Sequence, residues 1–322
     1  MNSQTVVITG ANSGIGKAAA IRFASEGCHV IMACRDVAKS EPVRQEVIKS
    51  AHNGSVELRP VDVSSIPSIE DFCRDFHSRH DTLDILIHNA GYFNHGIKTY
   101  QFSADGLELT FATNTFGPHL MTELLLEALG RSEDPRILTA NSSNIKHFFD
   151  PKRAIEFDNL QGEFHDSRPY TVYKMYGDSK MGLLLLTYKM AEAYRPYGIK
   201  VNSIMIPAVK VSRQTLNKLS SYYRLIGPLV QNLNPYSLTP QQMAGIYFHL
   251  CTSGDLKEVT GVLFDSRSNI LLRGEKHKPL SFFTLIRELW NTRHVPAYAS
   301  DPENIERMWT LSKKVISRHR QK

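Results

Sequence analysis

Short, almost entirely apolar runs recur along most of the chain, separated by longer stretches of mixed polarity. Because these runs are apolar throughout rather than alternating, they predict strands buried on both faces, which is typical of a parallel sheet. The predicted strands cover residues 5–9, 30–34, 56–61, 83–88, 136–141, 200–204 and 261–264. The predicted helices end near Ser25, begin at Ser65, and span 105–129 and 173–194. This alternation predicts an α/β fold with a doubly wound, mostly parallel sheet and helices on both faces.

No stretch rich in Pro, Gly or Ser divides the chain, and no internal repeat occurs, so a single domain is predicted. Residues 1–274 are expected to form its main body, and 275–322 a C-terminal helical extension. Three stretches break the alternation: 144–172, 207–238 and 266–322. Irregular insertions in such folds usually lie near the ends of the strands, where ligands bind, so a substrate loop is predicted at about 207–238.

The extension contains an apolar stripe with the spacing i, i+3, i+4, i+7, i+8, which predicts an amphipathic helix. The stripe consists of Phe282, Leu285, Ile286, Leu289 and Trp290. We interpret it as a surface that packs against the domain or a second subunit; the alternative is a helix on a membrane surface. A second helix is predicted from Pro302 to about Ser317, with Asp301 as a candidate cap.

The composition is basic, with 38 Lys and Arg against 32 Asp and Glu and a formal net charge of +6 over 322 residues. Such a balance raises the question of nucleic-acid or anionic-membrane partners. Most of the excess, however, lies in residues 311–322, which contain several lysines and arginines and no acid. We therefore expect no nucleic-acid partner, and contact between this tail and a membrane surface is kept only as a hypothesis.

The sequence favours a cytoplasmic protein. No segment reaches the ~18 apolar residues of a membrane span, and the N-terminus lacks the basic and apolar regions of a secretion signal. The four cysteines form no CxxC pair, which favours reduced thiols. His77 and His80, on a predicted helix, are interpreted as a surface pair, and no metal site is expected.

A glycine-rich turn follows the first predicted strand and opens a helix, with glycines at 10, 14 and 16. Gly10 allows a tight turn, Gly14 lets the backbone approach a pyrophosphate, and Gly16 allows the helix to pack closely on the strand. The spacing is GxxxGxG rather than the common GxGxxG, and a simple glycine-rich turn is the alternative. The turn predicts a Rossmann-type dinucleotide site, to which its other residues also contribute: Asn12, Ser13 and Ile15.

The end of the second strand is expected to lie at the adenosine ribose, where an NAD enzyme usually places an acid. This chain has Cys34 followed by Arg35 there, and a guanidinium suits a 2′-phosphate by charge and by bidentate geometry. Arg35 therefore favours NADP(H) over NAD(H), although a surface arginine is the alternative and Asp36 weakens its field. Further cofactor contacts are predicted after the third and fourth strands, at Asp62, Asn89, Ala90 and Gly91.

Tyr176 and Lys180 form a YxxxK pattern within a predicted helix, so the ammonium can lie close to the phenol on one helix face. A phenol has a pKa of about 10 and is a poor base at neutral pH, and a nearby cation lowers that pKa. Tyr176 could then exchange a proton with an alcohol or carbonyl. Tyr170 and Lys174 match the same pattern, but the apolar run that follows Lys180 favours Tyr176.

Together these segments carry a resemblance. TGANSGIGK, ACRD, HNAG, TNTFGPHLMT, SSN and YGDSK, in that order and spacing, closely resemble the short-chain dehydrogenase/reductase family. FDNLQGEF at 157–164 resembles the retinol-dehydrogenase-like NADP(H) branch of that family. The resemblance covers about residues 5–210 and implies hydride transfer between a nicotinamide cofactor and a carbonyl or alcohol.

The resemblance also implies roles at the matching positions. Asn114 would hold a water in a proton relay, and Ser143 would orient the substrate oxygen. Tyr176 would be the general acid/base, and Lys180 would bind the nicotinamide ribose and lower the pKa of the tyrosine. Contacts on the nicotinamide side are expected from Pro207 and Ser212.

The sequence departs from the branch at three places. His88 stands where the branch commonly has the first of two asparagines, and Ala208 stands where it usually has glycine after proline. The loop at 207–238 is not a close match, so retinoid specificity does not follow. Many members of the branch carry an N-terminal membrane anchor, and none is expected from this sequence.

The sequence thus predicts an NADP(H)-dependent oxidoreductase whose partner is a small-molecule carbonyl or alcohol. The alternative is a non-catalytic NADP-binding regulator or scaffold, and a narrower rival is the reduction of a C=C bond. By analogy with the family, the helices predicted at 105–129 and 173–194 could form the faces of a homodimer.

Overall fold

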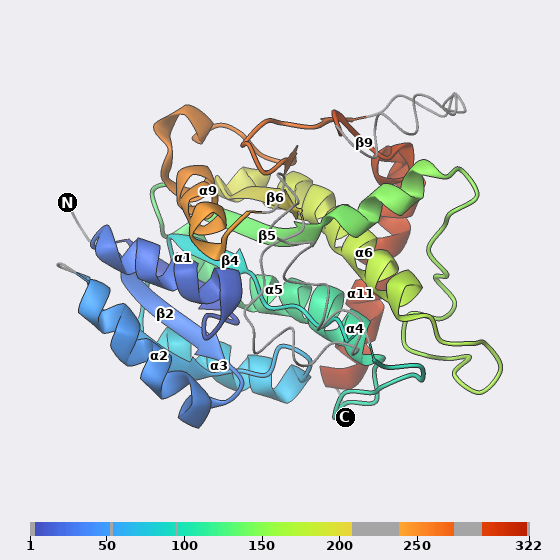
Figure 1. The fold of residues 1–322 in the computed structure, drawn as a ribbon, viewed down its shortest axis with the longest axis horizontal. Coiled ribbons are helices and arrows are strands. Elements are labelled where there is room, and N and C mark those ends of the chain that lie inside the picture. The colour runs from blue at the N-terminus through green and yellow to red at the C-terminus, as the bar shows by residue number, and fades with distance from the viewer. Residues whose placement is uncertain (1–3, 52–53, 95, 208–237, 274–291, 321–322) are drawn as a thin grey trace.

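The structure is a computed structural model that describes residues 4–51, 54–94, 96–207, 238–273 and 292–320 (Figure 1). Seven strands form one sheet in the order β3-β2-β1-β4-β5-β6-β7, and every pair of neighbours is parallel. The strands are β1 (Thr5–Thr9), β2 (His29–Cys34), β3 (Val56–Pro60), β4 (Ile85–His88), β5 (Arg136–Ser142), β6 (Lys200–Ile206) and β7 (Leu263–Phe264). Each lies within a few residues of its predicted range, and the predicted fold class is confirmed.

Helices cover both faces of the sheet (Figure 1). One face carries α1 (Gly14–Ser25), α2 (Val37–Ser50) and α9 (Pro240–Thr252). The other carries α3 (Ile66–Arg79), α4 (Leu109–Phe111), α5 (Gly117–Gly130), α6 (Val172–Ala193) and α11 (Pro302–Arg320). Shorter elements are 3₁₀ turns at Ser143–Phe149, Arg195–Tyr197, Gly254–Leu256 and Ala297–Ser300, and the parallel pair β8 (Leu272–Arg273) and β9 (His294–Val295).

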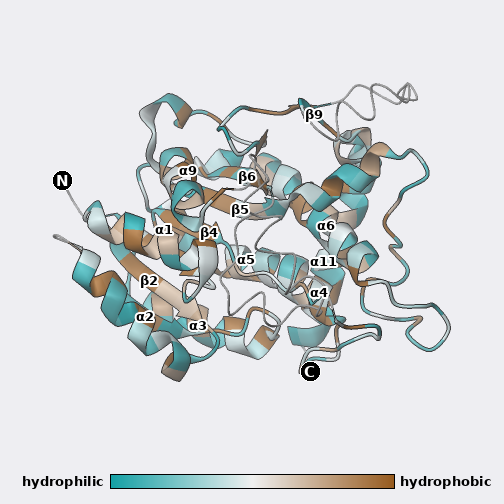
Figure 2. Cartoon of the chain, viewed as in Figure 1, coloured by the Kyte–Doolittle hydropathy of each residue, from teal (hydrophilic) through white to brown (hydrophobic). Residues whose placement is uncertain are grey.

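Alternation of side chains along the strands divides the core into two layers. Val7 and Ile31 belong to the apolar cluster under α3, α5 and α6, whereas Val6 and Val30 belong to the cluster under α1 and α9. All four side chains are at most 1% exposed. In Figure 2 the central strands are largely hydrophobic, while the helices also bear hydrophilic residues. Burial on both faces explains why the strand sequences are apolar throughout.

Two helices were not predicted from the sequence pattern. In α2 only Ser40 and Val47 are buried, so it has little apolar periodicity, and Asp36 caps it by accepting the N–H of Lys39 at 3.0 Å. A capping box starts α9, in which Thr239 accepts the N–H of Gln242 at 3.2 Å and the Gln242 side chain accepts the N–H of Thr239 at 2.8 Å. The apolar stripe predicted at 282–290 lies outside the described residues.

The helix predicted over 105–129 begins later than expected. Gly106 has φ +77°, which belongs to a turn, and the side chain of Glu108 caps α4 by accepting the N–H of Phe111 at 2.9 Å. A π-helical turn, Ala112–Phe116, then joins α4 to α5. Hydrophobic periodicity could not reveal this start, because the positive φ and the cap depend on local backbone geometry.

All four cysteines are free and buried, as the absence of a CxxC pair suggested. Burial raises the pKa of Cys28 to about 11, and that of both Cys73 and Cys251 to about 12. Burial also raises the pKa of Cys34. These side chains therefore act as small apolar groups in the core.

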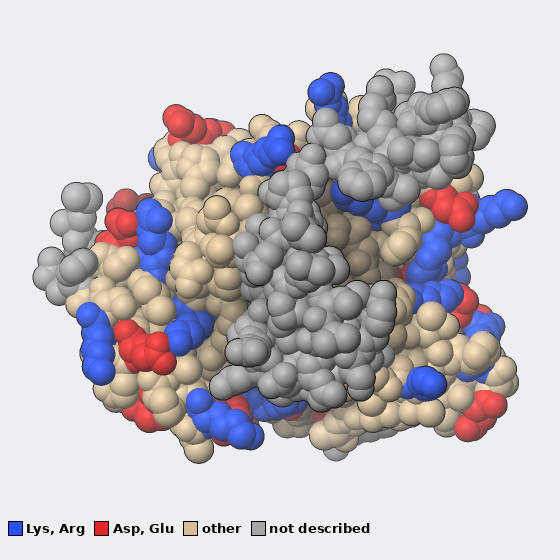
Figure 3. All heavy atoms as spheres, in the orientation of Figure 1, with Lys and Arg blue, Asp and Glu red and all other residues tan. Residues whose placement is uncertain are grey.

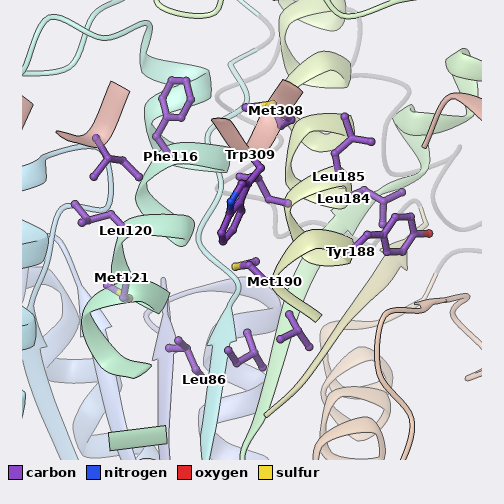
Figure 4. Close-up of a cluster of buried hydrophobic side chains, with 14 of the residues drawn as sticks. Leu86, Phe116, Leu120, Met121, Leu184, Leu185, Tyr188, Met190, Met308 and Trp309 are labelled. Carbon is purple, nitrogen blue, oxygen red and sulfur yellow. The ribbon is translucent and has the colours of Figure 1, made fainter. Parts of the chain in front are cut away.

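The C-terminal helix α11 packs across α6 and against α5 through an apolar face. Trp309 lies between these two helices (Figure 4), with its ring centroid 4.6 Å from that of His119 on α5 and 6.3 Å from that of Tyr194. Ser312 meets the same His119, with 2.7 Å between its Oγ and the Nδ1 of the histidine. Part of the helical surface that the sequence suggested as a dimer face is therefore covered by the chain itself.

Replacing Trp309 with Ala should lower the free energy of unfolding by ~3 kcal/mol or more, because a large buried ring is lost and a cavity remains. Tyr197→Ala is the matched control, since that aromatic side chain is 64% exposed, and its effect should stay within ~0.5 kcal/mol. Urea denaturation followed by circular dichroism measures both. If Trp309→Ala lowers the free energy of unfolding no more than the control does, the packing of α11 contributes little to stability.

Candidate active site

A cavity of about 1550 Å³ opens at the carboxyl ends of the parallel strands. Its walls come from the segments that follow β1, β2, β3, β4, β5 and β6, together with the first turns of α6. Parallel strands bring all their carboxyl ends to one edge of the sheet, which is where open α/β folds bind ligands. This cavity contains most of the predicted site residues.

The glycine turn forms one end of the cavity. Gly10 and Gly14 have φ of +65° and +53°, which glycine adopts without strain. A Cβ on Gly16 would lie 2.3 Å from the carbonyl oxygen of Gly10, so helix and turn can approach this closely only without a side chain. Because α1 begins at Gly14, its first N–H groups are available for an anion at this end.

Predicted contacts of this turn divide into two groups. Those that line the cavity are Gly10, Asn12, Ser13 and Ile15. Gly14 and Gly16 are not part of the lining; the first sits in the turn, and the second allows the close packing just described.

Thr9, which was not singled out from the sequence, holds the segment after β4 in place. Its Oγ1 accepts the N–H groups of Asn89 and Ala90, both at 3.0 Å. The amide of Asn89 in turn donates to the carbonyl oxygen of Thr9 at 3.0 Å. These bonds fix Asn89, Ala90 and Gly91 along the cavity, where the sequence predicted that the chain would pass close to the cofactor.

The residues after β2 and β3 form the opposite wall. The Arg35 side chain is 73% exposed, and its nearest acidic contact is Asp62, 3.9 Å away. Asp36 is engaged elsewhere, because it caps α2 and pairs with Lys39 at 2.6 Å. Arg35, Asp62 and Lys39 all line the cavity. The Arg35 guanidinium is thus the least neutralised cation at this wall among the described residues.

Tyr176 and Lys180 lie one turn apart on α6 and both line the cavity. The ammonium of Lys180 lies 5.9 Å from the centroid of the Tyr176 ring and donates to the carbonyl oxygen of Ala140 at 2.8 Å. Burial lowers the pKa of Lys180 to about 8. The ring of Phe93 covers Tyr176, with 4.3 Å between the centroids.

The competing pair matched by the same pattern has other contacts. Lys174 pairs with Glu156 at 2.8 Å and with Asp178 at 3.1 Å, and neither Tyr170 nor Lys174 lines the cavity. The geometry therefore separates two matches that spacing alone left open.

Ser142, which was not singled out from the sequence, also acts on the phenol, and the role implied for Ser143 stays a prediction. Burial raises the pKa of Tyr176, and a hydrogen bond with the Ser142 side chain opposes this rise. Both serines line the cavity, but Ser142 ends β5 whereas Ser143 begins the 3₁₀ turn. The two residues are adjacent and identical, so the sequence offered no signal that could distinguish them.

Asn114 is fully buried in the π-helical turn and does not line the cavity. Its Oδ1 accepts the N–H of Tyr92 at 2.7 Å, and its Nδ2 donates to the Tyr92 carbonyl at 3.1 Å and to the Ser179 hydroxyl at 3.0 Å. Its side chain therefore anchors the segment after β4 to α6, and the water-holding role implied by the resemblance stays a prediction.

On the nicotinamide side, Pro207 lines the cavity, whereas Ser212 and Ala208 lie outside the described residues. His88 is buried, with its Nε2 2.8 Å from the hydroxyl of Thr122, and it is not part of the cavity lining. Burial, with a smaller contribution from His119, lowers the pKa of His88 to about 3. The histidine that replaces the family's asparagine is thus a neutral core residue.

Known proteins resemble this chain in sequence and in fold. The family model described as short chain dehydrogenase matches residues 4–149. Retinol dehydrogenase 12 of Mus musculus is 32% identical over 96% of this chain and 85% of its own length. The chain belongs to the short-chain dehydrogenase/reductase family, and within it resembles the retinol dehydrogenases.

Solved structures share the fold at lower identity. A 3-ketoacyl-(acyl-carrier-protein) reductase from Brucella melitensis complexed with NADH has a TM-score of 0.59 at 22% identity, covering 81% of this chain and 96% of its own. A short chain dehydrogenase from Shigella flexneri 2a complexed with NADP has a TM-score of 0.61 at 18% identity, covering 83% and 98%. The chain is therefore an oxidoreductase of a family that uses a nicotinamide cofactor on alcohol and carbonyl groups of small molecules.

Replacing Gly16 with Ala should lower the free energy of unfolding by ~1–3 kcal/mol, because the new Cβ overlaps backbone that cannot rotate away. The same variant should bind NADPH and NADH more weakly, since the turn must open. Gly245→Ala on α9 is the control: its Cβ would meet only the Arg22 side chain, at 3.8 Å. Denaturation and cofactor titration measure both effects. Equal behaviour of the two variants would refute the packing role of Gly16.

Proposed function

We propose that the protein is an NADP(H)-dependent oxidoreductase that interconverts a small-molecule carbonyl and its alcohol, with Tyr176 as general acid/base. The observation that carries this proposal is the pairing of Tyr176 and Lys180 on one face of α6 at the wall of the cavity. The Ser142 side chain, which lowers the pKa of the phenol against the effect of burial, completes the group.

Tyr176 would move the proton. During reduction its hydroxyl donates a proton to the carbonyl oxygen, and during oxidation the phenolate accepts the proton of the alcohol. Bringing a phenol from a pKa of about 10 to about 7 requires ~4 kcal/mol of differential stabilisation. Burial alone acts in the wrong direction, since it raises the pKa of Tyr176, so the stabilisation must come from charge and hydrogen bonding.

Lys180 and Ser142 would supply that stabilisation. Lys180 is 4% exposed, and in such surroundings its charge acts on the phenolate with little screening by water. Its carbonyl partner, Ala140, fixes the ammonium while leaving further N–H donors for a ribose hydroxyl. The Ser142 hydroxyl would orient the substrate oxygen, the role that the resemblance gave to Ser143.

The residues present fit a dinucleotide. Gly10, Asn12, Ser13 and Ile15 would hold the pyrophosphate end, and Asn89 to Gly91 the adenosine ribose. Asp62 would bind the adenine amino group, and Pro207 the nicotinamide side. A bound nicotinamide supplies or takes up the hydride.

The preference for NADP(H) over NAD(H) rests on Arg35. Its guanidinium is exposed at the cavity wall, and its acidic neighbour among the described residues, Asp62, lies 3.9 Å away, so it is available for a 2′-phosphate. Asp36, the nearest acid in sequence, already accepts the N–H of Lys39 and pairs with the Lys39 ammonium. That carboxylate is therefore poorly placed to accept a ribose 2′-hydroxyl.

The proposal includes a cytoplasmic enzyme with a small-molecule partner and no nucleic-acid partner. Acidic and basic side chains are interspersed on the face in Figure 3, which does not favour binding of a polyanion such as a nucleic acid.

None of the helices in the described ranges combines the length and apolar character that crossing a bilayer requires. Val315 and Ile316 of α11 are buried, so these two apolar side chains are not available to a membrane surface. A homodimer, if formed, must use surfaces other than the part of α5 and α6 beneath α11.

A non-catalytic NADP-binding regulator is the competing proposal. No specific observation favours this proposal. The presence of both Tyr176 and Lys180 in the cavity lining argues against it, because a protein without catalysis needs neither residue. Cofactor binding by the wild-type protein without turnover of any aldehyde, ketone, steroid or retinoid would favour it.

Tyr176→Phe should reduce turnover with NADPH and a panel of aldehydes and ketones by ~100-fold or more, because the proton donor is lost. Binding of NADPH should persist. Tyr170→Phe is the control, since it removes the hydroxyl of the other tyrosine that matches the same pattern, and it should leave turnover nearly unchanged. Retention of more than about a tenth of wild-type turnover by Tyr176→Phe would refute the mechanism.

Arg35→Gln should raise the KM for NADPH by ~10-fold or more, because charge-assisted hydrogen bonds to the 2′-phosphate are lost. The KM for NADH should change little, since NADH has no such phosphate. Arg44→Gln serves as the control. This change on α2 also removes an arginine, but one that pairs with Glu41, with 2.7 Å between the guanidinium and the carboxylate. A wild-type preference for NADH, or equal effects on both cofactors, would overturn the assignment of Arg35.

A further inference from the structure

A second cluster of polar side chains, whose atoms could bind a metal ion, lies away from the cavity. His29, Glu57 and His80 each direct one ligand atom to a common point, and these atoms all lie within 4.8 Å of one another. The Nε2 of His29 is 3.2 Å, and that of His80 is 3.3 Å, from the same oxygen, Oε1 of Glu57. Sequence interpretation had grouped His80 with His77 as a surface pair.

The fold brings these residues together from three elements. His29 begins β2, and Glu57 lies near the start of β3, in register with Ile31. Because residues two apart share a face, His29 and Glu57 project from the same face of the sheet. His80 follows α3, which packs on this face through Phe72 and Phe76.

The contacts of the two histidines with Glu57 are not hydrogen bonds. The Nε2 atoms of His29 and His80 are both buried, and neither has a hydrogen-bond partner within the described part of the chain. Each nitrogen lies beside the Glu57 carboxylate without hydrogen-bond geometry, which leaves its hydrogen-bonding capacity poorly satisfied. A cation between them and Glu57 would satisfy both at once.

The spacing fits zinc. With bonds of ~2.0–2.1 Å, two ligands of a tetrahedral Zn²⁺ lie ~3.3–3.4 Å apart. The two separations from Glu57 Oε1 agree with this to within ~0.2 Å, and the third, between the two Nε2 atoms, is at most 4.8 Å, so the imidazoles must close on the ion when it binds. The side chains of His29 and His80 are 16% exposed and that of Glu57 is 25% exposed, so solvent can supply a fourth ligand.

Neighbouring groups already orient two of the three ligands. The hydroxyl of Ser55 contacts Nδ1 of His29, which leaves Nε2 directed at the cluster. Arg59 donates to Oε2 of Glu57 from its Nε at 2.8 Å and so leaves Oε1 to the histidines. The positive charge of Arg59 opposes a cation, and Asp75, 3.6 Å from its Nε, partly offsets that charge.

We propose that His29, Glu57 and His80 bind one Zn²⁺ through Nε2, Oε1 and Nε2, with water as the fourth ligand. The ion would join the starts of β2 and β3 to the end of α3. Arg35, at the cavity, is six positions beyond His29 along β2, a span of ~20 Å. The site is therefore structural, and its occupancy should change stability rather than hydride transfer.

Zinc titration of the full chain tests the proposal. The protein should carry no affinity tag, since a histidine tag binds Zn²⁺, and should first be dialysed against a chelator. Calorimetry should then show one Zn²⁺ per chain, and the Tm should rise with added Zn²⁺. Binding of Zn²⁺ only at several weak sites per chain would overturn the proposal.

Variants locate the ion. His29→Gln and His80→Gln should each weaken Zn²⁺ binding by ~100-fold or more and abolish the rise in Tm. His77→Gln, in the last turn of α3 shortly before His80 but outside the cluster, should bind Zn²⁺ like the wild type. Undiminished stoichiometric binding in the double variant H29Q/H80Q would overturn the assignment.

X-ray absorption at the zinc edge keeps the test valid if a variant fails to fold. The zinc-loaded wild-type protein should show only nitrogen and oxygen ligands, at ~2.0–2.1 Å, with the multiple-scattering signature of two imidazoles. Sulfur ligands at ~2.3 Å would place the ion on cysteine and refute the proposal.

Discussion

The burial of both faces of the parallel sheet is the constraint on which the rest of the structure depends. Each crossover must carry the chain over one face and return it to the same edge, so every strand ends at that edge. Apolar side chains from alternate strand positions fill the two core layers. The polar residues that follow the strands are thereby gathered into one cavity, although they are distant in sequence.

The buried charge of Lys180 connects the sheet to the proposed catalytic residues. The Lys180 ammonium reaches from α6 to the carbonyl oxygen of Ala140 on β5, in the layer next to Ser142 and Tyr176. Because water is excluded there, the pKa of Lys180 falls to about 8, and its charge becomes sensitive to any anion that enters. Asn114 adds a second connection by joining Tyr92 to Ser179 through its amide. Both links fix α6 against the ends of β4 and β5.

Much of the fold and part of the site could be predicted from sequence because they depend on local patterns. Apolar runs located the strands, and the glycine turn and the Tyr176–Lys180 spacing marked two walls of the cavity. The rest depends on information that local patterns lack. The weakly amphipathic α2 is defined by a cap, and Ser142 differs from Ser143 only in its place at the end of β5. The meeting of His29 with His80 requires the register of two strands and the docking of α3.

The four buried thiols have a practical consequence. A thiolate rather than a thiol attacks an alkylating reagent, and burial keeps Cys28, Cys34, Cys73 and Cys251 in the thiol form at neutral pH. The folded protein should therefore be nearly inert to maleimides without removal of any native cysteine. A single cysteine introduced on the surface would become a unique position for a spectroscopic label, and pairs of such labels could report distances across the cavity in solution.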